Sequence, residues 1–359
     1  MSRLSAPLLG GHGIVAYELQ ALCPWLAPDR TLHPRPGRQG LTMIAQPNPA
    51  TDSEGPAADP PAPACVMCFN ASDPSGASGL AGDIATVAAM GAHALPIVTA
   101  IVMRDTADIF DQHDIDPEAV AEQARAILED VTIAGWKVGF LGTADNVSAV
   151  AEILSDYTEI PLVAYVPNLS WMEDDVLQPY QDAFRELILP ATEVLVGSHK
   201  TLQDFLLPDW ESERPPSARE LAVAAGEHGT RFVLVTGIML ASKGTEQFID
   251  NVLASPQGAI AGEKFERFDA AFIGAGDTLS AALASLLAAG GELQAAVGEA
   301  LSFLDQSLDA GFRPGMGHIV PDRFFWALPP PEEGEGSEGE MPEPEPMDPK
   351  GKGAQRRVH

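Results

Sequence analysis

Two glycine-rich loops carry the residues best suited to chemistry. The later loop reads Gly274-Ala275-Gly276-Asp277 and runs into a helix of small residues. Two glycines at a helix start leave successive backbone N–H groups uncovered, which with the helix dipole form a site for an anion. Asp277 beside that site is a candidate base for a hydroxyl proton, although aspartate is also a common helix N-cap. This pairing favours phosphoryl transfer to an alcohol over hydride transfer.

The earlier loop covers residues 70–79 and reads NASDPSGASG. It follows an apolar run and opens a helix, so Gly76 and Gly79 would let a polar or anionic ligand approach the backbone closely. Turns with proline and glycine are common after strands. The loop therefore indicates a binding site chiefly because a second such loop is present.

The segments between residues 64 and 328 must position these loops. Six apolar runs without clean alternation read as strands covered by helices on both faces: residues 64–69, 93–102, 136–141, 161–166, 192–197 and 231–237. The segments between them place apolar residues three and four apart, as helices do. This alternation predicts a three-layer αβα domain with a mainly parallel central sheet. Ligands of such sheets bind at the carboxyl ends of the strands, where both loops lie.

Charge restricts the class of partner. The 359 residues include 21 Lys and Arg against 51 Asp and Glu, a net charge of −30. Residues 64–328 hold 13 of the basic and 38 of the acidic groups, so most of this charge belongs to the predicted domain. Such a domain is poorly suited to nucleic-acid phosphates or anionic lipid. We therefore expect a small-molecule substrate and neither a nucleic-acid nor a membrane partner.

Cysteine usage and the chain ends complete this picture. Three cysteines exclude a disulfide scaffold and favour the cytoplasm. Cys65 and Cys68 form a C-x-x-C, but in a strand residues three apart point to opposite faces, so we interpret them as core residues. Residues 1–63 read as a disordered extension and linker, with Met43 a candidate translation start, and residues 329–359 read as a disordered acidic tail rich in Pro, Gly and Glu.

Four segments in order resemble a known family: ASDPSGASGLAGD from residue 71, TAIVMRDT from 99, WKVGFLGT from 136 and GAGDTLSAAL from 274. They resemble the ribokinase-like superfamily and, within it, the hydroxymethylpyrimidine and phosphomethylpyrimidine kinases of thiamine biosynthesis. The resemblance covers residues 64–328. It implies a kinase that uses ATP and Mg²⁺ to phosphorylate the hydroxymethyl group of an aminopyrimidine and then the monophosphate. It also implies a possible homodimer.

The resemblance assigns roles to individual residues. Gly274, Ala275 and Gly276 would form the anion hole, and Asp277 would face the substrate hydroxyl, where the pyrimidine kinases usually have cysteine and the sugar kinases aspartate. The residues expected near the substrate are Ala71, Asp73, Ser78 and Asp83 from the first loop and the helix after it, with Val102 and Phe140 as apolar walls of the ring site.

Arg104 departs from the family, which generally has a glutamine that reads the pyrimidine edge at this position. Arginine offers only donors, so it cannot both donate to and accept from the ring. It suits an anionic substrate such as the monophosphate, or it forms a surface or salt-bridged arginine near Asp105.

Further departures lie on the nucleotide side. The family's Asn-x-x-Glu appears as Ser198-His199-Lys200-Thr201, and a usual lysine is Thr236 in Thr236-Gly237. Ser198, Lys200, Thr236 and Gly237 remain the nucleotide-binding candidates. An acid expected after the fourth strand is missing, and the metal ligands stay unassigned. The run from Glu173 to Asp175 either substitutes for it or forms a solvated acidic loop.

Three functions remain open. The leading hypothesis is a hydroxymethylpyrimidine-type kinase. Arg104 keeps open a kinase for pyridoxal or another heteroaromatic alcohol, and the nucleotide-side departures keep open a non-catalytic pyrimidine-binding protein. His318, in a closing segment that also resembles the family, is interpreted as a packed turn residue rather than a catalyst.

Overall fold

The computed structural model describes residues 62–240 and 247–327 of the chain. The predicted N-terminal extension, the Met43 start and the acidic tail lie outside these residues, apart from Ala62 and Pro63. Within the described part, no helix combines the length and apolarity that a bilayer span requires.

A nine-stranded sheet forms the centre of the domain, in the order β3-β2-β1-β4-β5-β6-β7-β8-β9. Its six central strands pair in parallel, which confirms the predicted fold class. These are β2 (His93–Arg104), β1 (Cys65–Ser72), β4 (Gly135–Val138), β5 (Leu162–Tyr165), β6 (Val194–Ser198) and β7 (Phe232–Met239). Each contains or overlaps one of the apolar runs. Free Cys65 and Cys68 lie on β1, with Cys68 buried as predicted.

Three strands were not predicted: the edge strands β3 (Ile109–Asp114) and β9 (Gly258–Glu266), and β8 (Phe248–Ser255), which lies between β7 and β9. All three pair antiparallel with their neighbours. β3 and β9 contain charged and amide side chains and are largely exposed, whereas β8 is mostly buried but carries Asp250 and Asn251 among its apolar residues. They therefore lack the continuous apolar run of a strand that is covered on both faces.

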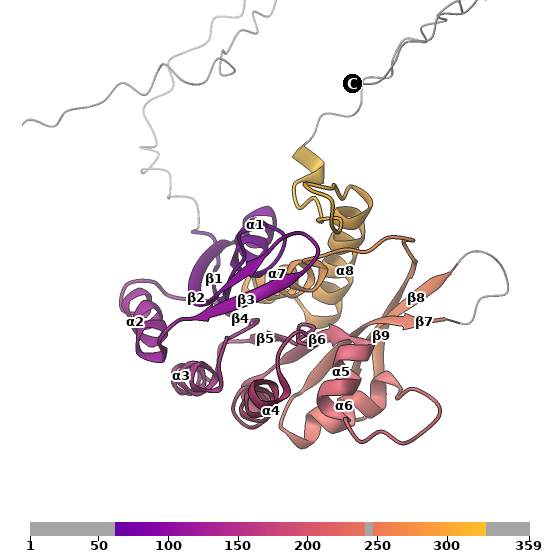
Figure 1. Ribbon diagram of the computed structural model, residues 1–359, viewed down its shortest axis with the longest axis horizontal. Helices are drawn as coiled ribbons and strands as arrows, with labels where there is room; N and C mark the ends of the chain where they lie inside the picture. Colours follow the sequence, from indigo (N-terminus) through magenta and orange to yellow (C-terminus); the bar gives the residue numbers. More distant parts are fainter. Residues whose placement is uncertain (1–61, 241–246, 328–359) are drawn as a thin grey trace, which may run out of the picture. The chain divides into compact units, whose positions relative to one another are not determined.

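Helices cover both faces of the sheet (Figure 1). One face carries α1 (Gly79–Ala89), α7 (Ala275–Ala288) and α8 (Leu293–Asp309). The other carries α2 (Pro117–Leu128), α3 (Ala144–Ser155), α4 (Asp174–Ala183), α5 (His199–Leu206) and α6 (Ala218–Glu227). A π-helical turn (Phe184–Ile188) and short 3-10 turns (Leu189–Ala191 and Phe325–Ala327) complete the elements. Two hydrophobic cores result, one on each face of the sheet.

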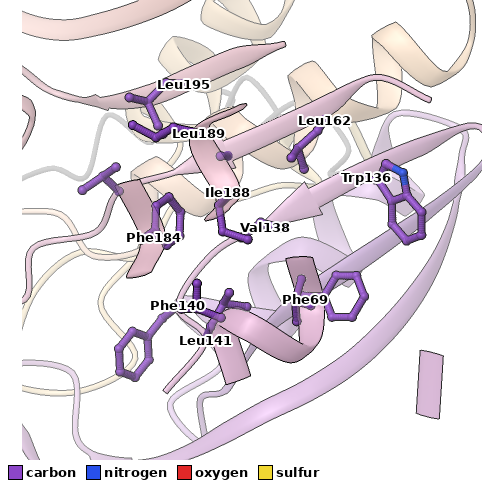
Figure 2. Close-up of a cluster of buried hydrophobic side chains, with 14 of the residues drawn as sticks. Phe69, Trp136, Val138, Phe140, Leu141, Leu162, Phe184, Ile188, Leu189 and Leu195 are labelled. Atoms are coloured by element: carbon purple, nitrogen blue, oxygen red, sulfur yellow. The ribbon is translucent and has the colours of Figure 1, made fainter. Parts of the chain in front are cut away.

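Strand β4 shows how this packing prepares the site. Trp136 and Val138 enter the core under α2–α6, where Trp136 stacks on Phe69 with ring centroids 5.9 Å apart (Figure 2). Side chains alternate along a strand, so Lys137 between them points to the opposite face. There it lies fully buried beneath α1 and α7, beside the two glycine-rich loops.

Candidate active site

A cavity of about 390 Å³ opens at the carboxyl ends of β1, β2 and β5. Both glycine-rich loops reach it. Eight of the residues expected in the site line it: Ala71, Asp73, Ser78, Val102, Arg104, Phe140, Gly274 and Asp277. The geometry thus brings together segments that lie about 200 residues apart in the chain, since Gly79 N donates to Asp277 Oδ2 across 198 positions.

The start of α7 is shaped by Gly274. Its φ of 83° lies in the left-handed region, and a Cβ there would overlap the carbonyl oxygen of Ala77. The first helical hydrogen bond runs from Thr278 N to Gly274 O at 3.0 Å. The amides of Ala275, Gly276 and Asp277 therefore have no acceptor within the helix. Three N–H groups at the positive end of a helix dipole form a suitable site for an anion.

Asp277 is held at the cavity by three contacts. Its Oδ1 accepts from Lys137 Nζ at 2.7 Å and from Asn70 Nδ2 at 2.8 Å, and its Oδ2 accepts from Gly79 N at 3.0 Å. Burial alone would raise the pKa of Asp277, but the Lys137 charge and these hydrogen bonds hold it below its usual value. The carboxylate therefore stays ionised beside the free amides of α7.

Lys137 is shared with a second carboxylate. Its Nζ lies 2.8 Å from Asp83 Oδ1, and both side chains are fully buried. Burial raises the pKa of Asp83 to about 6 even though Lys137 lowers it. Burial would also lower the pKa of Lys137, but Asp277 and Asp83 together hold it above its usual value, so the lysine stays protonated. Asp83 is buried behind the residues that line the cavity and is not one of them.

Asp73 organises its own loop. Its carboxylate accepts from Ser75 N at 2.8 Å and Ser78 N at 2.9 Å, and from both serine hydroxyls. Arg104 approaches this loop from β2, with Nη1 3.3 Å from Ser78 Oγ and 3.9 Å from Asp73 Oδ2. Its side chain is 8% exposed and lines the cavity, so it is not a surface arginine.

Apolar and aromatic groups supply the remaining walls. Val102 and Phe140 are both buried, and Phe140 meets Trp171 edge to face with ring centroids 5.8 Å apart. His318 also lines the cavity, and its backbone N donates to Thr106 O at 2.9 Å. The cavity is the size of a small-molecule site, and its lining combines apolar side chains with polar and charged ones, among them Asn168, Ser170 and His318.

The nucleotide-side candidates lie outside this cavity, at the ends of β6 and β7. Ser198 and Thr236 are paired in register, and Ser198 caps α5 through a bond from Thr201 N. Gly237 N donates to Asn251 Oδ1 at 2.9 Å. The Lys200 side chain is 84% exposed and pairs with Asp204 at 2.7 Å. The four candidates therefore lie together at the carboxyl ends of β6 and β7.

Acidic groups do not assemble a metal cage. Glu173 precedes α4, and Asp174 and Asp175 form its first turn, where all three are exposed. In the part of the chain that the structure describes, no three His, Cys, Asp or Glu side chains are grouped to hold a metal ion. The exposure of these three residues supports the interpretation of the run as a solvated acidic loop.

Four residues of the site were not singled out from the sequence: Asn70, Lys137, Tyr165 and Arg323. The signal for Lys137 was a charge inside a buried apolar strand, which requires paired carboxylates nearby. Asn70 donates to both Asp83 and Asp277. Arg323 donates to Ala77 O and Thr278 Oγ1, and so joins the two glycine-rich loops. No local pattern in the sequence marks the contacts of Asn70 and Arg323.

Tyr165 makes Gly276 a sensitive position. A Cβ at Gly276 would overlap the tyrosine ring. We expect Gly276→Ala to lower the free energy of unfolding by about 1–3 kcal/mol, the usual cost of overpacking. Chemical denaturation measures this loss. Adding Tyr165→Ala should make the double variant lose less than the sum of the two single losses, because the clash is gone.

The matched control is Gly258→Ala, where no atom lies within 4 Å of the added Cβ. Its stability should change by no more than about 0.5 kcal/mol. If the stability losses of the Gly276→Ala and Tyr165→Ala variants simply add in the double variant, the close approach of Gly276 to the Tyr165 ring would be contradicted.

Comparison with known proteins places this geometry among kinases. The profile of the family described as phosphomethylpyrimidine kinase matches residues 73–322. The hydroxymethylpyrimidine/phosphomethylpyrimidine kinase of Mycobacterium leprae is 30% identical over 264 residues, which cover 71% of this chain and 92% of the relative. The Escherichia coli K12 protein of the same name is 30% identical over 273 residues, 73% of this chain and 97% of its own.

Solved structures agree on the fold. Bacillus subtilis pyridoxal kinase, in an ADP complex, aligns with a TM-score of 0.64 at 21% identity, over 75% of this chain and all of its own. Phosphomethylpyrimidine kinase from Clostridium difficile 630 aligns with a TM-score of 0.55 at 20% identity, over 67% of this chain and 98% of its own. At these identities the likeness concerns the architecture alone.

Proposed function

Because the chain belongs to the phosphomethylpyrimidine kinase family, we propose that it phosphorylates 4-amino-5-hydroxymethyl-2-methylpyrimidine, its monophosphate, or both, with ATP in thiamine biosynthesis. One observation carries the proposal for this chain. The ionised Asp277 carboxylate lies at a ring-sized cavity beside three amides without helical acceptors. Phosphoryl transfer to an alcohol needs this combination of a base and fixed donors.

The chain's own residues have distinct tasks in this reaction. Val102 and Phe140 exclude water around the acceptor ring. Asp277 accepts the hydroxyl proton as the acceptor oxygen bonds to the γ-phosphorus, and the bond from that phosphorus to the departing ADP oxygen breaks. The amides of residues 275–277 stabilise the charge of the transferring group. Lys137 touches no reacting atom and positions Asp277.

ATP and Mg²⁺ are parts of the proposal. A structure of Staphylococcus aureus pyridoxal kinase, similar in fold at 18% identity, is described as a complex with AMP-PCP and pyridoxal. Ser198, Lys200, Thr236 and Gly237 are proposed on the nucleotide side. Mg²⁺ commonly needs only one or two carboxylates besides substrate phosphates and water, and the residues that would hold it stay unassigned. It would neutralise phosphate charge as the counter-ion of ATP.

The direct test supplies purified full-length chain with Mg·ATP and the hydroxymethylpyrimidine, or its monophosphate, and measures ADP. Release of ADP that depends on the pyrimidine supports the proposal. Absence of turnover with both acceptors would contradict it. A thermal-shift screen then separates a non-catalytic binder, which the pyrimidine but not Mg·ATP would stabilise.

Arg104 favours a second candidate, a kinase for pyridoxal or another heteroaromatic alcohol. Its guanidinium presents only donors to the cavity, and an aminopyrimidine edge also contains a donor. We expect Arg104→Gln to raise kcat/KM for the aminopyrimidine relative to pyridoxal by about 2- to 10-fold, the value of one hydrogen bond. Arg104→Lys, which keeps a donor-only cation, is the matched control. The same acceptor preference in Arg104→Gln and wild type would count against this role.

A homodimer and a cytoplasmic location stay predictions. The homodimer follows from the family resemblance, and the cytoplasmic location follows from the cysteine usage.

A further inference from the structure

The Asp277 carboxylate presents only hydrogen-bond-accepting oxygens to the substrate group that is to be phosphorylated. Its three recorded partners, Lys137, Asn70 and the Gly79 amide, all donate to it. Lys137 is protonated, but Asp277 and Asp83 hold its pKa above its usual value, so it donates hydrogen bonds without giving up its proton. The nucleophilic oxygen that reaches this group must therefore bring the hydrogen itself.

The cations near Asp277 do not open a place for a second anion. Lys137 is fully buried and divides its charge between Asp277 and Asp83, so this trio keeps one negative charge. Arg323 is buried and bonds Ala77 O and Thr278 Oγ1, and it does not line the cavity. Arg104 does line it, but Asp73 lies 3.9 Å away.

The family name includes two phosphoryl acceptors, the hydroxymethylpyrimidine and its monophosphate, and they differ in the group that would face Asp277. The alcohol carries an O–H that donates to a carboxylate. A phosphate monoester, with a second pKa of about 6, is largely a dianion at neutral pH and has only acceptor oxygens. Placing it against Asp277 would bring two anions together in a partly desolvated site, where their repulsion is weakly screened.

We propose that Asp277 restricts this site to alcohol acceptors, so that the chain catalyses the first phosphoryl transfer and not the second. This rests on the proposed function. In the permitted step, the alcohol oxygen bonds to the γ-phosphorus, the bond to ADP breaks, and the hydroxyl proton passes to Asp277. The monophosphate product would then need a separate phosphotransferase to become a diphosphate.

The test measures kcat/KM of the full-length chain for the hydroxymethylpyrimidine and, separately, for its monophosphate, with Mg·ATP and with products identified by mass spectrometry. The expected ratio is at least about 100 in favour of the alcohol. A ratio within about threefold of unity, or a preference for the monophosphate, would overturn the inference and leave the kinase function standing. Turnover of neither acceptor would overturn both.

Asp277→Asn provides the second arm, because asparagine keeps the size of the side chain and removes its charge. The variant should lose alcohol turnover, while the alcohol-to-monophosphate ratio falls at least 10-fold. Binding of the monophosphate, measured by calorimetry, should tighten in the variant even if chemistry is slow. Glu299→Gln, an exposed change on α8, is the matched control and should keep the wild-type ratio. An unchanged ratio and unchanged binding in Asp277→Asn would contradict the role of the charge.

Discussion

We expect the replacement of Lys137 by methionine to lower the free energy of unfolding by about 3–5 kcal/mol, the usual cost of removing one partner from a buried ion pair. Methionine fills a similar volume but leaves Asp83 and Asp277 facing each other without a cation. Both carboxylates should then bind protons more readily in the folded than in the unfolded chain. The variant should therefore lose most stability at high pH and regain part of it in acid.

Urea denaturation at pH 8 and pH 5 measures both effects. Lys200→Met is the matched control, since Lys200 pairs with Asp204 on the surface, and pairs of this kind contribute about 0.3–0.5 kcal/mol. Adding Asp83→Asn to Lys137→Met should restore part of the loss by removing one unpaired charge. A loss below about 1 kcal/mol, or one that grows as the pH falls, would contradict the buried trio.

We expect Asp277→Asn to lower kcat for the alcohol by about 10²–10⁴-fold, the range of general base catalysis. Asparagine retains one oxygen, which can still accept from Lys137 and Asn70, while its NH2 group replaces the oxygen that accepts from the Gly79 amide. The variant should therefore fold with some loss of stability. KM for ATP should change little, because the free amides of α7 remain. Steady-state kinetics gives the split between kcat and KM, and circular dichroism checks the fold. If the variant keeps the wild-type kcat, the proposed role of Asp277 as the general base would be contradicted.

The sequence predicted the centre of the sheet better than its edges. Residues buried on both faces form continuous apolar runs, so β1, β2 and β4–β7 were visible as strands. The edge strands β3 and β9 mix polar and apolar residues because much of their surface is exposed, and the more buried β8 interrupts its apolar residues with Asp250 and Asn251. Their identity depends on pairing with a neighbour rather than on their own composition.

The site residues also divide into those that a local sequence feature predicts and those that depend on distant contacts. The glycine loops and Asp277 were predictable because a helix start next to glycines is a local feature. Lys137 meets Asp277 across 140 positions, and Arg323 meets Ala77 across 246, so neither partner could be read from spacing. Asp83 was expected near the substrate, whereas its carboxylate lies behind the wall and neutralises Lys137.

The three-dimensional arrangement also changes the meaning of the net charge of −30. Three cations, Lys137, Arg104 and Arg323, are concentrated at the two loops, although the domain around them is acidic. They are matched there by Asp83, Asp73 and Asp277. Net charge therefore says little about the local field at the anion site, where the cations are balanced by aspartates and the α7 amides supply the unpaired donors.

A single-turnover experiment tests the base role of Asp277 most directly. Enzyme in excess of ATP labelled in its γ-phosphate is mixed with Mg²⁺ and the hydroxymethylpyrimidine, and label on the pyrimidine is followed over time. Wild type should transfer the label in one phase, while Asp277→Asn, with ATP equally bound, should transfer it at least about 100-fold more slowly. Equal transfer rates in the two proteins would contradict the account.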